Sequence, residues 1–161
     1  PIVFMSYLNP LMAFGYDKLV RRAKDVGVCG FIVPDLPLEE SDELRYELDK
    51  EDLGLIQLIS PTTPEERMAT LSEASKGFIY AVTMTGITGS DRGLAKNLTS
   101  YLSKISEMSD LPVCAGFGVR SARDVSMIGQ YADGAIVGSA LVETMEKKQD
   151  IIQFLKDLRQ F

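Results

Sequence analysis

The chain has 161 residues, of which 45% are hydrophobic and 25% are charged, enough for one globular domain with a core. The net charge of −6 argues against nucleic acid as a partner, and no apolar segment approaches the length of a membrane span. The sequence contains no histidine, which excludes a Ser-His-Asp triad and leaves proton transfer to Asp, Glu, Tyr or Lys.

Short apolar runs alternate with amphipathic segments along the whole chain. The runs are typical of strands buried on both faces in a parallel sheet, and the segments between them are typical of helices. We expect strands at residues 2–5, 29–33, 55–59, 77–82, 112–115 and 134–137. Cys29 and Cys114 fall beside or inside these runs, and we expect them to be buried free thiols of a cytoplasmic protein.

Capping residues and prolines predict where the helices begin. Because Pro10 disfavours helix at the residue before it, we expect a loop there, followed by a helix that Asp17 caps and Gly27 ends. Thr63 caps a later helix, in which Pro64 takes the first helical position. Further helices are expected over residues 97–108, 141–145 and 151–158.

Two loops after strands contain candidates for chemistry. Asp35 follows the second strand, and Pro34 and Pro37 stiffen its loop, which makes Asp35 the best acid or base that this pattern offers. Residues 83–93 are small, polar and rich in glycine. At the end of a strand such a segment predicts an active-site lid, and a surface loop is the alternative.

Glycine-rich turns follow the last two expected strands, Gly116 and Gly118 in one case and Gly138-Ser139 in the other. Glycine lets the backbone approach a ligand, and a helix after the turn adds free N–H groups. The two turns predict a phosphate site, and tight turns without a ligand are the alternative. A dinucleotide site is disfavoured because Ser121 takes the third position of the motif and the next strand ends without a carboxylate.

No linker divides the chain, and we expect one domain over residues 1–161. Its six strand–helix units predict an α/β fold with a parallel sheet. The residues leave open whether this is part of a TIM (β/α)₈ barrel or an open doubly wound sheet. The chain starts at Pro1 directly before a strand, which indicates a starting point inside a longer fold.

Several motifs occur in the order in which one known family carries them: Tyr7-x-Asn9-Pro10, residues 33–40, residues 60–67, residues 77–80, Gly86-x-Thr88-Gly89, residues 116–119 and residues 134–140. Through these motifs the chain resembles the tryptophan synthase alpha chain family over almost all of its length. The resemblance starts at the third strand of the family. It implies a TIM barrel of which this chain carries six βα units, the first two being absent.

The resemblance implies a lyase of tryptophan biosynthesis, which cleaves indole-3-glycerol phosphate to indole and glyceraldehyde 3-phosphate by a retro-aldol reaction. In the family, a Glu on the first strand and an Asp after the second transfer the protons. Neither position exists in this sequence. The expectation is therefore that the chain by itself is inactive, or active only when the missing piece complements it.

The binding half of the family's site is carried over residue by residue. The resemblance implies phosphate contacts by Gly89, Gly118, Gly138 and Ser139. It places Tyr80 and Phe117 along the substrate pocket, and Met5, Ile32 and Leu58 around the indole, although core packing is the simpler explanation for these last three. Thr88 matches the lid threonine that bonds a catalytic carboxylate, and Asp35 matches an acid beside the catalytic groups.

The resemblance also implies a partner, because the family works as an α₂β₂ complex with a tryptophan synthase beta chain. Pyridoxal phosphate belongs to that partner, and no cofactor is expected on this chain. Two other functions stay open on the residues. One is a non-catalytic phosphate-binding or interaction module, and the other is a different phosphate-binding enzyme of the TIM-barrel class.

Overall fold

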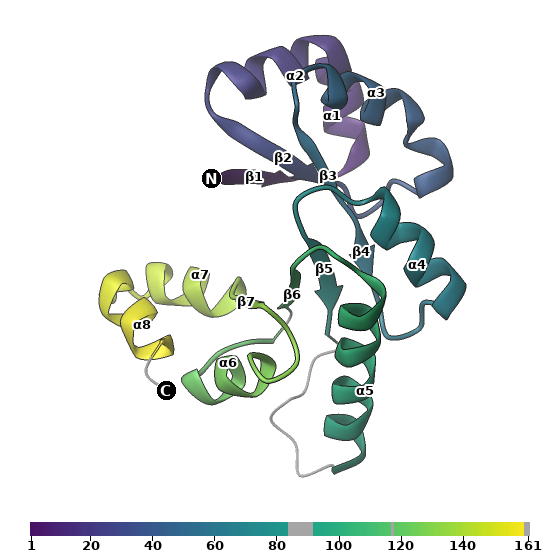
Figure 1. Ribbon diagram of the computed structural model, residues 1–161. Coiled ribbons are helices and arrows are strands. Elements are labelled where there is room, and N and C mark those ends of the chain that lie inside the picture. Colours follow the sequence, from purple (N-terminus) through teal and green to yellow (C-terminus); the bar gives the residue numbers. More distant parts are fainter. Residues whose placement is uncertain (84–91, 117, 160–161) are drawn as a thin grey trace.

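The computed structural model describes residues 1–83, 92–116 and 118–159, with the backbone alone for 92–97 (Figure 1). Its strands are β1 (Ile2–Met5), β2 (Val28–Ile32), β3 (Gly54–Ile56), β4 (Leu58–Ile59), β5 (Ile79–Val82), β6 (Val113–Gly116) and β7 (Gly134–Ile136). Its helices are α1 (Leu8–Phe14), α2 (Tyr16–Asp25), the 3₁₀ helix η1 (Leu38–Glu40), α3 (Asp42–Lys50), α4 (Glu65–Ala74), α5 (Arg92–Met108), α6 (Ala122–Ile128), α7 (Ser139–Glu146) and α8 (Ile151–Leu158).

The strands pair in parallel and in chain order, as β1-β2-β3 in one sheet and β4-β5-β6-β7 in a second. A doubly wound sheet reverses its strand order, whereas the wall of a barrel keeps it. The observed order is that of a partial barrel, and the open doubly wound alternative is wrong.

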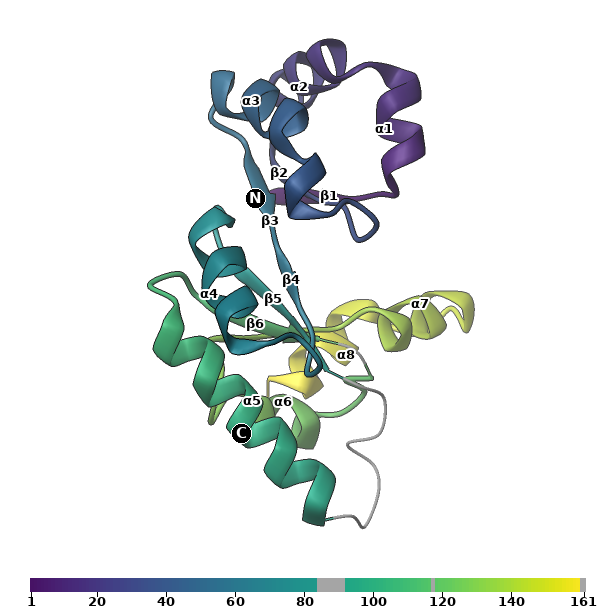
Figure 2. The same cartoon turned by 90° about the vertical axis from the view of Figure 1, so that its right-hand side faces the viewer.

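The expected strand at 55–59 is divided at Gln57. The N–H of Gln57 donates to the side-chain oxygen of Ser75 at 3.0 Å, and its carbonyl accepts from the N–H of Tyr80 at 3.0 Å. Both backbone groups of Gln57 are therefore hydrogen-bonded, one to the residue that follows α4 and one to β5, while β3, which precedes Gln57, still pairs with β2. This is where the wall changes from one sheet to the next (Figure 2).

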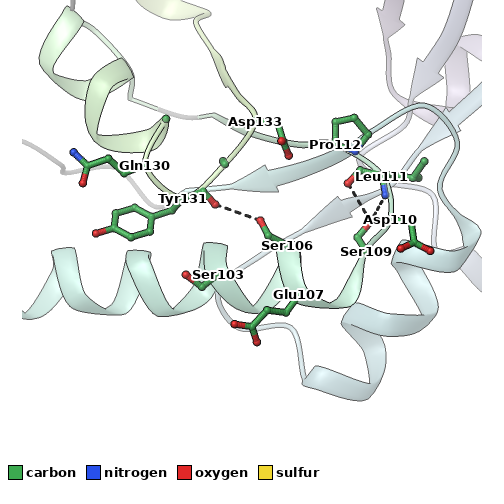
Figure 3. Close-up of a pocket in the computed structure, with 12 residues that line it drawn as sticks. Ser103, Ser106, Glu107, Ser109, Asp110, Leu111, Pro112, Gln130, Tyr131 and Asp133 are labelled. Carbon is green, nitrogen blue, oxygen red and sulfur yellow. Dashed lines mark hydrogen bonds between the residues drawn. The ribbon is translucent and has the colours of Figure 1, made fainter.

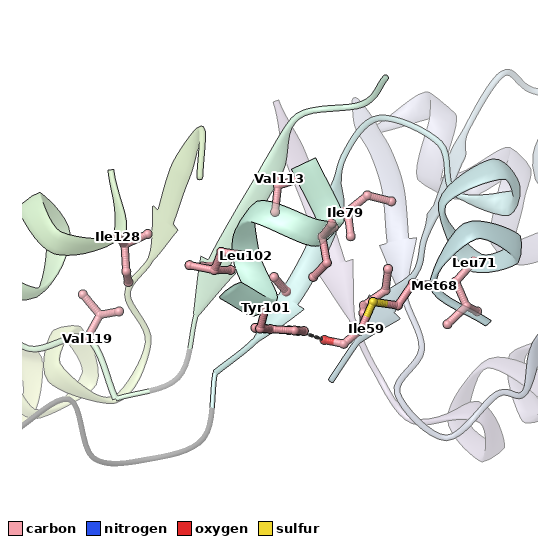
Figure 4. Packing of buried hydrophobic residues seen from close by; sticks show 12 residues of the cluster. Ile59, Met68, Leu71, Ile79, Tyr101, Leu102, Val113, Val119 and Ile128 are labelled. Atoms are coloured by element: carbon pink, nitrogen blue, oxygen red, sulfur yellow. Dashed lines mark hydrogen bonds between the residues drawn. The ribbon is translucent and has the colours of Figure 1, made fainter. Parts of the chain in front are cut away.

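Helices cover the outer face of both sheets, and Figure 2 shows α1, α2 and α3 grouped at the first sheet. Phe31, Leu44 and Leu48 are among the buried residues there. Behind the second sheet, Leu102 and Ile105 of α5 pack on Ile79 and Val113, and Tyr101 donates from its hydroxyl to the carbonyl of Ile59 at 2.5 Å (Figure 4). A separate cluster of Ile32, Ile56 and Tyr80 lies on the inner face.

Several local expectations are wrong. Pro10 lies inside α1, as its third residue, where a missing N–H costs no helical hydrogen bond. Gly15 and not Asp17 precedes α2, and Asp17 instead pairs with Arg21 at 2.7 Å. Pro64 stands at the N-cap of α4, one residue earlier than expected.

The remaining expectations concern the later helices and the two cysteines. The helix expected from residue 97 begins at Arg92. Cys29 is exposed and Cys114 is half-buried, so the expectation of two buried thiols is wrong. The final helical pair, α7 and α8, is confirmed.

Large apolar side chains are exposed at both ends of the strand order. At β1 these are Ile2, Phe4 and Met5, and on α7 and α8 they are Val142, Met145, Ile151, Ile152 and Leu155. Within the described residues, no helix has the length and apolar character that crossing a membrane requires.

Candidate functional site

The inner face of the wall carries four of the predicted pocket residues. Parallel pairing places Met5 beside Ile32 in one row and Leu58 beside Tyr80 in another. Ile32 and Tyr80 are only 7% and 6% exposed, Leu58 is partly buried, and Met5 is 53% exposed. The structure therefore brings Ile32, Leu58 and Tyr80 into one apolar cluster and leaves Met5 at its open margin.

Tyr80 lies directly against the first glycine turn. A Cβ on Gly116 would be 2.9 Å from the Tyr80 hydroxyl oxygen and 2.8 Å from Cβ of Ile136. Burial raises the pKa of Tyr80 above its ordinary value. At neutral pH the side chain is therefore a phenol, a polar group on an apolar wall, and not a proton acceptor.

The turn after β7 presents free backbone donors. Gly138 is the N-cap of α7, has no side chain with which to cap it, and has no atom within 4 Å of a Cβ placed there. Its carbonyl accepts from the N–H groups of Leu141 and Val142. The N–H groups of Ser139 and Ala140 precede these in the first turn, where a helix has no internal acceptor. Among the described residues, none comes within 4 Å of a Cβ placed on Gly138, which stands at the positive end of the α7 dipole.

The turn after β6 is built differently. Gly118 has φ of +78°, a conformation that glycine adopts without strain. Helix α6 begins only at Ala122, and Ser121 and Asp124 form a capping box across its start. The carboxylate of Asp124 also accepts from the N–H of Arg120 at 3.0 Å. The capping box thus engages the N–H groups of Ser121 and Asp124 at the start of α6, whereas α7 has no side-chain cap, and the predicted phosphate contacts stay a prediction for both turns.

Residues 1–161 match the model of the tryptophan synthase alpha chain family. The chain belongs to this family. One relative is the tryptophan synthase alpha chain of Carboxydothermus hydrogenoformans, which is 44% identical over 91% of this chain and 55% of that protein. Another is the tryptophan synthase alpha chain of Methanocaldococcus jannaschii, which is 41% identical over 100% of this chain and 57% of that protein.

Solved structures agree with this assignment. Tryptophan synthase subunit alpha from Campylobacter jejuni has a TM-score of 0.85 and 38% identity, covering 97% of this chain and 62% of that one. A chain from the tryptophan synthase α2β2 complex of Pyrococcus furiosus has a TM-score of 0.85 and 34% identity, over 98% and 66%. The fold is thus a partial TIM barrel, and the chain spans about three fifths of the length of the relatives it matches.

Asp35 has a structural partner in this member of the tryptophan synthase alpha chain family. Its Oδ1 accepts from the backbone N–H of Leu8 at 2.9 Å, so Asp35 caps the start of α1. The side chain is exposed at the carboxyl ends of β1 and β2. It does not belong to the apolar cluster around Tyr80.

Thr88, Gly89 and Phe117 lie outside the described residues, as does most of the segment 83–93 that predicts a lid. Thr83, at the start of that segment, is buried and donates from its hydroxyl to the carbonyl of Gly116 at 3.0 Å. This bond joins the ends of β5 and β6. Among the described residues, no group of three His, Cys, Asp or Glu side chains is placed to hold a metal ion.

A cavity of about 670 Å³ opens at the other edge of the wall, where β6 and β7 begin (Figure 3). Glu107, Asp110 and Asp133 are among its lining residues. Asp133 is engaged there, since its carboxylate accepts from the N–H of Val113 at 2.8 Å. The cavity lies away from the glycine turns and has no part in the candidate site.

Proposed function

We propose that this chain carries the phosphate- and indole-binding part of a lyase that cleaves indole-3-glycerol phosphate to indole and glyceraldehyde 3-phosphate in tryptophan biosynthesis. The observation that carries the proposal is the uncapped start of α7 beside the Gly118 turn. Backbone N–H groups and a helix dipole suit a phosphate dianion, which needs donors and positive potential.

The apolar cluster supports the second half of the proposal. Ile32, Leu58 and Tyr80 form an apolar wall, and the row of Tyr80 continues to β6, which ends at the first glycine turn. A substrate with an aromatic ring at one end and a phosphate at the other fits such an arrangement. The apolar wall would take the ring, and the free amides would take the phosphate.

The reaction needs a proton donor at C3 of the indole and a base for the hydroxyl group of the glycerol chain. The family's Glu and Asp for these steps match no position of this sequence. Asp35, the carboxylate that the sequence offers instead, caps α1. In this proposal the 161 residues bind and orient the substrate, and the two carboxylates come from strand–helix units that the relatives carry in addition.

The proposal includes a tryptophan synthase beta chain as partner, which would hold pyridoxal phosphate, and a cytoplasmic location. The relative from Pyrococcus furiosus comes from a complex of this kind. A non-catalytic phosphate-binding module is the second candidate for the chain by itself. The engagement of Asp35 in capping favours that candidate.

The test measures binding and indole release separately. Indole-3-glycerol phosphate should bind to the 161-residue chain, and Gly138→Asp should abolish binding by placing a carboxylate at the amides. Indole release should appear only after addition of a segment with the first two βα units of a relative. Binding that is absent, or that ignores Gly138→Asp, would contradict the proposal. Binding without release in the complemented sample would favour the non-catalytic module.

A further inference from the structure

The two turns of the candidate phosphate site are joined by an ion pair. Arg120 follows Gly118 by two residues, and Glu143 lies on α7, one helical turn after Ser139. Nη2 of Arg120 donates to Oε2 of Glu143 at 2.5 Å. Residues four apart on a helix share a face, so Glu143 and Ser139 lie on the same side of α7. The pair thus joins the residue before the N-cap of α6 to the second turn of α7.

The backbone at Arg120 is held at the α6 end of this bridge. Asp124, which is buried, accepts from the N–H groups of Arg120 and Ser121 at 3.0 and 2.9 Å, and from the Ser121 hydroxyl at 2.8 Å. The backbone of Arg120 is therefore anchored to Asp124, and its guanidinium reaches from that point to Glu143. Glu143 belongs to α7, the helix whose first amides form the other half of the proposed site.

The contact between Arg120 and Glu143 favours the charged form of both side chains. The Arg120 guanidinium holds the pKa of Glu143 below its usual value, and Glu143 raises the pKa of Arg120. Both groups are therefore charged at neutral pH. Lys147 adds a second cation 3.9 Å from the same carboxylate oxygen.

We infer that Arg120 and Glu143 are a positioning pair for phosphate binding, which fixes the spacing between the Gly118 turn and the α7 amides. This inference rests on the proposed phosphate site. In this arrangement neither Arg120 nor Glu143 touches the phosphate, and the pair affects phosphate affinity only by positioning the backbone of the two segments. A direct role, in which Arg120 leaves Glu143 and binds the phosphate itself, is the competing arrangement.

Removal of the carboxylate separates the two roles. If the pair positions the turns, Glu143→Gln loosens the site and weakens binding of glycerol 3-phosphate. If Arg120 is a ligand, Glu143→Gln frees it and tightens binding. Glu146→Gln, on the last residue of the same helix, is the matched control for the loss of one negative charge. The exchanged variant Arg120→Glu/Glu143→Arg rebuilds the pair in reverse, and it also carries Lys147→Gln because Lys147 lies 3.9 Å from the Glu143 carboxylate and would repel the introduced cation.

The dissociation constant is measured with glycerol 3-phosphate on the 161-residue chain, following the NMR amide signals of Gly118 and Ser139, with glycerol as the uncharged control. We expect Glu143→Gln to bind about two- to five-fold more weakly than Glu146→Gln, the effect of losing one exposed ion pair. The exchanged variant should recover affinity to within about two-fold of the original chain. Unchanged urea midpoints would show that the fold is intact.

The positioning role would be overturned if Glu143→Gln bound glycerol 3-phosphate as tightly as Glu146→Gln or more tightly. It would also be overturned if the exchanged variant bound no more tightly than Glu143→Gln. Failure of the proposed function looks different. In that case the original chain does not bind glycerol 3-phosphate, or binds it with no response to Gly138→Asp, and the inference fails with the site.

Discussion

The carboxylate of Asp35 lies 2.9 Å from the backbone nitrogen of Leu8 and binds the first N–H of α1 from a loop 27 residues further along the chain. That N–H has no acceptor inside its own helix. Asp35 therefore joins the ends of β1 and β2 and orients α1 at the carboxyl edge of the wall. Its carboxylate thus caps the start of α1.

Replacing Asp35 separates the hydrogen bond from the charge. Asp35→Ala removes the acceptor and should lower the free energy of unfolding by about 1 kcal/mol, the usual cost of a lost cap. Asp35→Asn keeps a carbonyl acceptor and should cost less than half of that. Urea unfolding of both variants measures the difference. An Ala variant as stable as the original chain would show that the bond to Leu8 contributes nothing, and an Asn variant as unstable as the Ala variant would show that the cap needs the carboxylate.

Gly116 and Tyr80 occupy adjoining space, which makes Gly116 intolerant of a side chain. A Cβ would meet the Tyr80 hydroxyl at 2.9 Å and Ile136 at 2.8 Å, and both neighbours are on strands. Gly116→Ala should cost about 1–3 kcal/mol of stability, the range for overpacking a core. Gly138→Ala is the control, because nothing lies within 4 Å of a Cβ there.

A double-mutant cycle identifies the neighbour responsible. In a Tyr80→Leu background the cost of Gly116→Ala should fall, since a smaller side chain leaves room for the new methyl group. An unchanged cost in that background would assign the clash to Ile136 alone. Urea midpoints and slopes of the four proteins provide the measurement.

Tyr80 should also make stability depend on pH in the alkaline range. Its pKa is raised in the folded chain by burial, whereas the unfolded chain releases the proton near pH 10. The contribution of Tyr80 to the free energy of unfolding is therefore complete below about pH 10, and it is lost as the pH rises toward the pKa of Tyr80 in the folded chain. Between about pH 9 and pH 11, Tyr80→Phe should lose less stability than the original chain. Parallel losses in the two proteins would contradict this assignment.

The order of strands and the glycine turns were predictable, because apolar runs and glycines are local signals. The break at Gln57 was not predictable. Gln57 is the one polar residue in the apolar run, but a single polar residue does not end a strand, and its N–H bonds to the Ser75 side chain, 18 residues away. The loop expected at Pro10 is a helix because the rule against proline does not hold in a first helical turn.

The candidate site shows the same division. The free start of α7 follows from Gly138 and the helix after it, both visible in the sequence. The capping box of Ser121 and Asp124 has a Ser-x-x-acid pattern that the sequence contains, although the Gly-x-Gly motif before it is also typical of an anion site. The bonds from Asp35 to Leu8 and from Arg120 to Glu143 join distant segments, and no local pattern indicates them.

The exposed apolar face of α7 and α8 should make the isolated chain associate with itself. Ile152 is 67% exposed, and Leu155 and Met145 are also exposed on these helices. Contiguous apolar surface of this kind drives association. The double variant Ile152→Lys/Leu155→Gln should lower the mass measured by light scattering. Gln153→Lys, on the same helix, is the control and should leave it unchanged. A monomeric original chain would contradict the prediction.

Gly138 offers a substitution that should abolish anion binding without harming the fold. Gly138 is the N-cap of α7, and none of the described residues lies within 4 Å of a Cβ placed there. Aspartate at an N-cap also interacts favourably with the helix dipole, so Gly138→Asp should keep or raise the urea midpoint. The same carboxylate competes with phosphate for the α7 amides and repels it. Binding of glycerol 3-phosphate should therefore fall below detection.

Gly138→Asn has nearly the same shape without the charge, and its affinity should lie between those of the other two proteins. A Gly138→Asp chain that keeps its urea midpoint and still binds glycerol 3-phosphate would show that the start of α7 is not the phosphate site. A lowered midpoint would contradict the predicted effect on stability.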